Sequence, residues 1–166
     1  MNEPPESEHT WPWVRYFLQG YLPVHRGASA NTVSSYRITF RQFRRYLYAR
    51  IGERSARDLL LSALDPTLIL DFLAWLQTKE GGGAKASTRN VRLAALRSFF
   101  RCLELYRPAE DRSRWERLRH LPQKRAPRPS RDHLEVRELN RVFAQINPSR
   151  REGLRDLVLL TILYNT

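Results

Sequence analysis

The sequence has a single cysteine, Cys102, which excludes an intrachain disulfide and a cysteine-based metal cluster. Because Cys102 lies within an apolar helical pattern, we interpret it as a small buried side chain. Histidines are also few, and they show neither catalytic nor metal-ligand spacing: His9, His25, His120 and His133. These absences predict no metal site, no cofactor and no small-molecule ligand.

Long apolar runs are missing as well, so no segment is expected to span a membrane. The first nine residues are acidic and contain two prolines, whereas a signal peptide would begin with positive charge. We therefore predict a cytoplasmic protein without a membrane partner, and a disordered start over residues 1–10.

Acidic residues are scarce relative to basic ones. The chain has 17 Asp and Glu against 29 Lys and Arg, a net charge of +12. Nearly all of the basic residues are arginines, whose planar guanidinium binds phosphate in a bidentate manner and stacks on bases. This excess favours a phosphate-bearing partner; a basic but inert surface is the alternative. The hydrophobic fraction of 42 % is sufficient for a folded core.

The stretch 28–50 combines an apolar seam with a cationic face. At about 100° per residue, one arc holds the apolar side chains and an adjoining arc holds the basic ones. The apolar arc comprises Val33, Tyr36, Phe40, Phe43 and Leu47; the basic arc comprises Ser34, Arg37, Arg41, Arg44 and Arg45. We predict a helix, capped by Ser29 or Asn31 and ending near Gly52, with a core behind it and a polyanion in front.

Two further helices flank this stretch. Thr10 as N-cap and Pro12 in the first turn predict a helix over residues 11–22, ended by Pro23 and Gly27. Its aromatic residues suit core packing better than base stacking. Asp65 and Pro66 start a third helix, whose inner face carries Leu68, Phe72, Trp75 and Leu76. The triplet Gly81-Gly82-Gly83 ends it, and we expect a flexible connection there.

A fourth helix is predicted over residues 85–106. Its inner seam comprises Val91, Ala95, Leu96, Phe99, Cys102, Leu103 and Tyr106. Its first turns gather polar and basic side chains suited to phosphates or base edges: Lys85, Ser87, Thr88, Arg89, Asn90 and Arg92. Ser87 and Thr88 serve equally well as plain helix caps. Arg92 falls within the apolar arc, so it lies beyond the end of the core or extends out of it.

Residues 108–131 change in character, with many cations and with prolines at 122, 127 and 129 that prevent a continuous helix. We predict a basic linker whose Lys124, Arg125 and Arg128 hold a phosphate backbone; a solvated basic loop is the alternative. Asp132 or Ser130 then starts another helix. The last stretch, 157–164, is almost wholly apolar, the pattern of a buried helix, and we expect a chain truncated before the rest of that core.

Five segments, in order, resemble the tyrosine recombinase family of phage-integrase and Xer-type enzymes. The first is the pattern Thr32, Ser35-Tyr36-Arg37, Phe40, Phe43 and Leu47. Segments 65–76 (DPTLILDFLAWL) and 87–104 (STRNVRLAALRSFFRCLE) are similar to the third and fourth helices of the family's core-binding domain. Segment 121–129 (LPQKRAPRP) resembles the interdomain linker. Segments 133–143 and 155–166 resemble the first helices of the catalytic domain.

The resemblance implies an all-α fold. It comprises a four-helix SAM-like core-binding bundle over 11–107, a basic interdomain linker over 108–131 and the first two helices of a truncated catalytic domain over 132–166. The implied function is that of the DNA-binding portion of a site-specific recombinase, which clamps duplex DNA and joins other recombinase protomers in the full-length protein. The alternatives are a stand-alone, non-enzymatic helical DNA-binding protein, such as a regulator or an inhibitor, and an RNA-binding module.

The resemblance also places the family's catalytic residues beyond Thr166, so no residue of this chain is assigned to catalysis. None of its tyrosines matches the position of the family's nucleophile: Tyr16, Tyr21, Tyr36, Tyr46, Tyr48, Tyr106 and Tyr164. We therefore expect this polypeptide alone to cut no DNA strand, although the family it resembles consists of enzymes that cut and rejoin DNA. We make no assignment of the chain as an enzyme.

Overall fold

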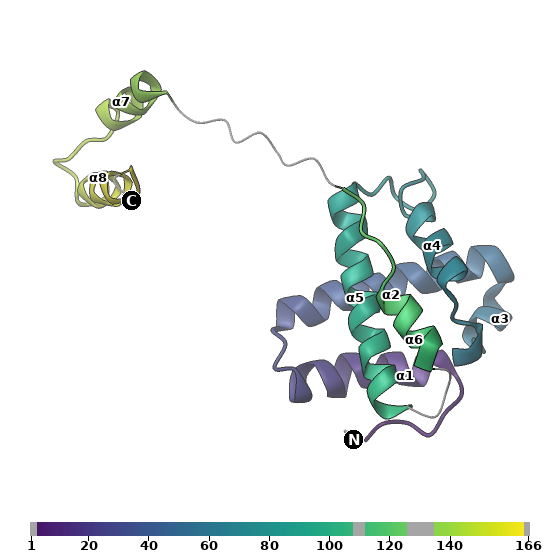
Figure 1. The fold of residues 1–166 in the computed structure, drawn as a ribbon. Helices are drawn as coiled ribbons and strands as arrows, with labels where there is room; N and C mark the ends of the chain where they lie inside the picture. The colour runs from purple at the N-terminus through teal and green to yellow at the C-terminus, as the bar shows by residue number, and fades with distance from the viewer. Residues whose placement is uncertain (1–2, 108–111, 126–134, 165–166) are drawn as a thin grey trace. The chain divides into compact units, whose positions relative to one another are not determined.

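The computed structural model describes residues 3–107, 112–125 and 135–164, which form helices, turns and one isolated β-bridge (Figure 1). The predicted all-α class is confirmed. The chain divides into two compact units, Met1–Ala126 and Pro127–Thr166. Within the described ranges no helix has both the length and the apolar character needed to cross a membrane.

The first helix, α1, spans Thr10–Tyr16 and continues directly into wider π-helical turns, η1, over Phe17–His25. His9 occupies the N-cap position, and the hydroxyl of Thr10 is buried without a hydrogen-bond partner, so the predicted N-cap is wrong. The helix also continues through Pro23. A proline removes only one backbone donor, and the amide of Arg26 bonds to the Tyr21 carbonyl five residues back, at 3.1 Å.

Helix α2, Ala30–Ile51, has the predicted boundaries and cap. The Ser29 hydroxyl accepts a hydrogen bond from the Thr32 amide at 3.3 Å. At the other end Gly52 adopts a φ of 80°, which is accessible to glycine at no steric cost. The apolar seam of α2 faces inward and buries Phe40, Phe43 and Leu47.

A short helix α3, Glu53–Arg57, and a 3₁₀ turn η2, Leu61–Ala63, lead to α4, Pro66–Trp75. The predicted start of α4 is confirmed, because the Asp65 carboxylate accepts a hydrogen bond from the Leu68 amide at 2.7 Å. Phe72 and Leu76 on its inner face are fully buried.

The glycine triplet after α4 is a defined turn, so the expected flexible connection is wrong. The amide of Gly83 donates to the Thr78 carbonyl at 2.7 Å, and the next amide, of Ala84, donates to the Leu76 carbonyl. Gly82 and Gly83 have positive φ values, 101° and 63°. Gly81 packs directly on the backbone of Trp75.

We expect Gly81→Ala to destabilise the first unit by about 1–3 kcal/mol, the usual cost of overpacking. A β-carbon at this position would lie 1.9 Å from the Trp75 carbonyl oxygen, so the backbone of the turn has to shift. Lys79→Ala is the matched control, because the Lys79 side chain is exposed in the same turn and its removal should change the free energy of unfolding by less than about 0.5 kcal/mol. Urea unfolding of both variants provides the test, and equal losses would contradict the close approach at Gly81.

Helix α5, Ala86–Tyr106, has 21 residues and is nearly as long as α2. Lys85 is at its N-cap and provides no side-chain cap bond, so neither Ser87 nor Thr88 caps it. The predicted seam is buried at Ala95, Phe99 and Cys102, but Val91 is 46 % exposed. Burial raises the pKa of the Cys102 thiol to about 12, which leaves it protonated and unreactive at neutral pH.

Helix α6, Arg112–Arg119, lies along α5 in Figure 1 and packs against the bundle. Trp115, Leu118 and Leu121 are almost fully buried, and the Trp115 ring stacks on Phe100 with centroids 6.4 Å apart. Over residues 112–125 the structure therefore differs from the expected basic linker. An apolar stripe at intervals of three residues attaches this stretch to the core despite its many arginines.

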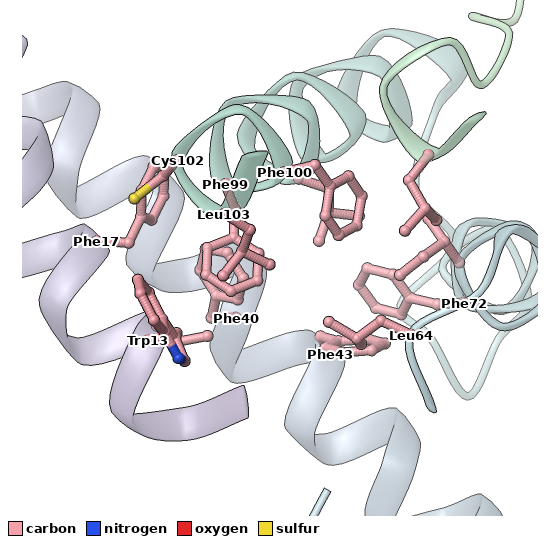
Figure 2. Close-up of a cluster of buried hydrophobic side chains, with 14 of the residues drawn as sticks. Trp13, Phe17, Phe40, Phe43, Leu64, Phe72, Phe99, Phe100, Cys102 and Leu103 are labelled. Atoms are coloured by element: carbon pink, nitrogen blue, oxygen red, sulfur yellow. The ribbon is translucent and has the colours of Figure 1, made fainter. Parts of the chain in front are cut away.

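Aromatic side chains from several helices meet in the centre of the first unit (Figure 2). Phe17, Phe40 and Phe99 join η1, α2 and α5, with ring centroids 5.2–5.8 Å apart. Phe43 and Phe72 join α2 to α4 at 5.1 Å. Edge-to-face pairs of this kind stabilise a core beyond the area they bury. The aromatic residues thus pack the core, as predicted, and are not a platform for bases.

The segment before α1 is bound to the bundle, so the expected disordered start is wrong for residues 7–9. The Ser7 carbonyl accepts hydrogen bonds from the Trp13 indole at 2.8 Å and from the Arg107 guanidinium at 3.2 Å. Arg107 also forms an ion pair with Glu8 at 2.5 Å. We refer to Ser7, Glu8, Trp13 and Arg107 as the N-terminal clasp.

The second unit contains α7, Val136–Ala144, and α8, Arg151–Tyr164. Glu135 is at the N-cap of α7, and its amide donates to the Glu138 carboxylate at 3.0 Å. The predicted caps Ser130 and Asp132 lie outside the described residues. Most apolar side chains of α8 are exposed, among them Leu159 at 51 % and Leu163 at 73 %, whereas Leu157 and Leu160 are partly buried.

Candidate nucleic-acid interface

The exposed face of α2 carries the cations predicted from its helical periodicity. Ser34, Arg37 and Arg41 are all exposed, because Phe40 and Phe43 anchor the adjoining face in the core. No acidic residue occurs within Ala30–Ile51. Helix periodicity and burial of the seam are sufficient to present these side chains to solvent.

Arg44 and Arg45 have aromatic and carbonyl partners. The Arg44 guanidinium lies 5.9 Å from the ring centroids of both Trp11 and Tyr48. Arg45 lies 5.0 Å from the Trp75 ring and donates to the Glu80 backbone carbonyl at 2.8 Å. These partners are uncharged and fix the direction of the guanidinium groups. Among the described residues no carboxylate forms an ion pair with any of the four α2 arginines 37, 41, 44 and 45, so their charge is uncompensated.

A shallow groove runs between α1 and α2. It has a volume of about 270 Å³, an apolar floor and a cationic edge. The floor is formed by Trp11, Val14, Leu18 and Phe40, and the edge by Arg37, Arg41 and Arg44. Low-dielectric walls lined by charge of one sign concentrate the electrostatic potential, which attracts a polyanion to this part of the surface.

At the start of α5, Lys85, Ser87 and Thr88 are exposed. Because Lys85 contributes no side-chain cap bond, the first amides of α5 have no side-chain acceptor, and the helix dipole adds partial positive charge there. The predicted cluster is therefore present, but only its first three members face solvent freely.

Arg89 and Arg92, predicted to contact DNA, are instead engaged inside the bundle. Arg89 is only 5 % exposed and donates to the Pro122 carbonyl at 3.3 Å. Arg92 is partly buried and donates to the Ser35 carbonyl on α2 at 3.2 Å. Burial lowers the pKa of both guanidinium groups, although arginine remains charged at neutral pH. Arg92 lies in the apolar arc and Arg89 at its edge, next to Leu96, and a long side chain at such a position reaches a neighbouring backbone carbonyl.

Asn90 is likewise occupied. Its side-chain amide donates to the Lys124 carbonyl at 2.7 Å and accepts from the Lys124 amide at 3.0 Å. The ammonium of Lys124 donates to the Gln77 side chain at 2.5 Å, a neutral partner that leaves its charge uncompensated. Arg125 is exposed, and Arg128 lies outside the described residues.

The sequence interpretation missed Arg97 and Gln77. Arg97 donates to the Leu121 carbonyl, and Gln77 binds Lys124. Both contacts join residues more than twenty positions apart in sequence. At about 100° per residue Arg97 lies nearly opposite the centre of the predicted seam of α5, so no local signal pointed to it, and none pointed to Gln77.

The described tyrosines include three that are poorly suited to nucleophilic chemistry. Tyr16, Tyr21 and Tyr46 are buried, and in each case desolvation is the main cause of a raised pKa of the phenol. A raised pKa lowers the fraction of phenolate available for attack. In the parts of the chain that the structure covers, no three His, Cys, Asp or Glu side chains lie close enough together to hold a metal ion.

Comparison with known proteins identifies relatives for almost the whole chain. Two proteins of Sinorhizobium fredii named as integrase/recombinase, y4rC and y4rD, are each 33 % identical to it, over 93 % and 96 % of the chain. The tyrosine recombinase XerC 2 of Ralstonia nicotianae is 27 % identical over 98 % of the chain. The chain spans about half of the length of these relatives: 46 %, 56 % and 47 %. No solved structure matches significantly.

The family described as "Phage integrase, N-terminal SAM-like domain" matches residues 15–105. This segment begins in α1 and ends one residue before the end of α5, so it contains the α2 face and the start of α5. Because the match covers more than half of the chain, the chain belongs to the phage integrase family of tyrosine recombinases, through its N-terminal SAM-like domain.

Proposed function

We propose that the first unit binds duplex DNA through α2 and the start of α5, as the DNA-binding portion of a site-specific tyrosine recombinase. The observation that carries this proposal is the set of uncompensated arginines on α2. DNA phosphates can neutralise the charge of these arginines. Each such contact releases counterions from the DNA, which favours binding. The names of the relatives, recombinases and integrases, support the same assignment.

Duplex DNA suits this surface better than RNA or a single strand. The major groove of B-DNA admits an α-helix, whereas that of A-form RNA is too deep and narrow for side chains to read. Single strands are held by exposed aromatic side chains, but Trp13, Phe17 and Phe43 are buried in the core.

The proposal includes a clamp. Lys124 and Arg125 add cations next to the start of α5, because Asn90 binds the backbone of Lys124. Cations on α2 and on this exit segment then hold one stretch of DNA backbone from two sides. We also propose that the longer protein joins other protomers on DNA and acts in the cytoplasm, and that its strand cutting requires residues outside 1–166.

Binding is tested by titrating the chain onto duplex DNA at several salt concentrations. We expect the logarithm of the association constant to fall linearly with the logarithm of the salt concentration, by about 0.9 per phosphate contact. A slope near zero would refute DNA binding.

The same DNA, carrying a nick next to a cleavage site, tests for cutting. We expect no covalent protein–DNA complex, because Tyr16, Tyr21 and Tyr46 are buried with raised pKa values. The resemblance to the family places none of the other four tyrosines at the position of the nucleophile. This observation also favours a second candidate, a stand-alone DNA-binding protein that cuts no strand. Complementation of the chain with a separately expressed catalytic domain of a relative distinguishes the two, because only a recombinase portion would restore exchange.

A further inference from the structure

We propose that α5 holds the chain where it leaves the first unit, and that Asn90 is the positioning residue of this tether. Three α5 side chains, Arg97, Arg89 and Asn90, bind in turn the backbone of Leu121, Pro122 and Lys124. The tether itself requires no ligand. Its consequence for DNA rests on the function proposed above.

The side chain of Asn90 forms two hydrogen bonds with the backbone of Lys124, one as donor and one as acceptor. Its amide group donates to the Lys124 carbonyl at 2.7 Å and accepts from the Lys124 amide at 3.0 Å. A primary carboxamide supplies both a donor and an acceptor on one planar group, which aspartate or alanine at this position cannot do. The pair therefore fixes the position and also the direction of the backbone at Lys124.

Arg89 orients this amide. Its guanidinium donates to the Asn90 side-chain oxygen at 3.3 Å and to the Pro122 carbonyl at 3.3 Å. Among the described residues the buried charge has no carboxylate partner, and burial lowers the pKa of Arg89, so holding the charge there has a desolvation cost. An arginine that served only to bind phosphate would remain solvated. Its placement instead sets which end of the Asn90 amide faces the Lys124 carbonyl.

The tether brings two groups of cations together. Asn90 lies three residues, about one helical turn, after Ser87, so the backbone of Lys124 is held close to the exposed start of α5. The Lys124 ammonium is directed to Gln77, just beyond the end of α4. Lys124 and Arg125 thereby act with Lys85 on one phosphate track instead of moving independently of the bundle.

Limited trypsin digestion of the full chain without DNA tests the tether. In Asn90→Ala we expect cleavage after Lys124 and Arg125 to be about tenfold faster than in the wild type, because two hydrogen bonds that close this segment are lost. Cleavage after Arg41, in the middle of the core helix α2, requires this helix to open, so it reports global unfolding and should not change. Asn140→Ala is the matched control, because it is the same substitution at an exposed position of α7. It should leave the cleavage rates at all of these sites unchanged.

Unchanged cleavage after Lys124 and Arg125 in Asn90→Ala would overturn the tether. Equal acceleration after Arg41 would overturn it as well, since Asn90 would then support the whole fold. Salt titration with DNA separates this result from the function. If the tether serves binding, Asn90→Ala reduces the salt slope by about 1–2, as expected for loss of the Lys124 and Arg125 phosphate contacts. Faster cleavage together with no DNA binding by the wild type would refute the proposed function and leave the tether intact.

Discussion

Replacing Trp115 with alanine is expected to lower the free energy of unfolding of the first unit by about 3–5 kcal/mol, as for other large-to-small core substitutions. The Trp115 side chain is only 1 % exposed and stacks on Phe100 of α5. Its loss leaves a cavity between α5 and α6 that the surrounding helices cannot fill. The midpoint of guanidinium unfolding, followed by circular dichroism, measures the effect.

Two variants of α6 serve as controls. Arg117 is exposed on the same helix, so Arg117→Ala should change the free energy of unfolding by less than about 0.5 kcal/mol. Trp115→Phe should have a smaller effect than Trp115→Ala, because phenylalanine fills part of the space and the indole N–H makes no hydrogen bond within the described ranges that would be lost. If Trp115→Ala were no more harmful than Arg117→Ala, α6 would not belong to the core.

The second large effect is expected on DNA affinity, in the double variant Arg37→Ala, Arg41→Ala. Each lost phosphate contact should reduce the salt slope by about 0.9, which corresponds to about eightfold weaker binding at about 0.1 M salt. For both contacts the loss is about sixtyfold on the same scale, and it should be equal for all DNA sequences, because phosphates carry no sequence information. Fluorescence anisotropy with labelled duplexes at several salt concentrations measures both quantities.

Arg54→Ala is the matched control for each single substitution. Arg54 is exposed on α3, beyond the C-terminal end of α2, and its removal lowers the net charge of the chain by the same amount. We expect its salt slope to remain at the wild-type value. If Arg54→Ala weakened binding as much as Arg37→Ala, affinity would depend on total charge, and the α2 face would have no special role.

The fold could be predicted where its signals are local. Ser29 and Asp65 start their helices through bonds to amides three residues ahead, and the seam of α2 follows one helical period. Helix α6 was missed because its arginines and the nearby prolines resemble a solvated linker. The stripe formed by Trp115, Leu118 and Leu121 is visible in the sequence. Whether it is buried depends on the face of α5 that carries Phe100, against which Trp115 packs, and the sequence does not show this contact.

The interface could be predicted only in part, for a similar reason. Arg37 and Arg41 need nothing more than periodicity to be exposed. Arg89 and Asn90 look equally suitable in sequence, but their partners, Pro122 and Lys124, are 33 and 34 residues away. A polar side chain at the start of a helix is free to bind an anion only if it does not already donate a hydrogen bond to a backbone carbonyl. The sequence does not show which carbonyls accept such bonds.

The N-terminal clasp has a consequence for the folding kinetics of the first unit. It joins Ser7 to Arg107 across 100 residues, so the ends of a long loop must meet before its bonds form. Closing such a loop has an entropic cost that local helix formation does not have, and contacts of high sequence separation slow folding. We expect α2, α4 and α5 to assemble first and the clasp to close last. The segment before α1 would therefore be exposed longest to proteases during synthesis.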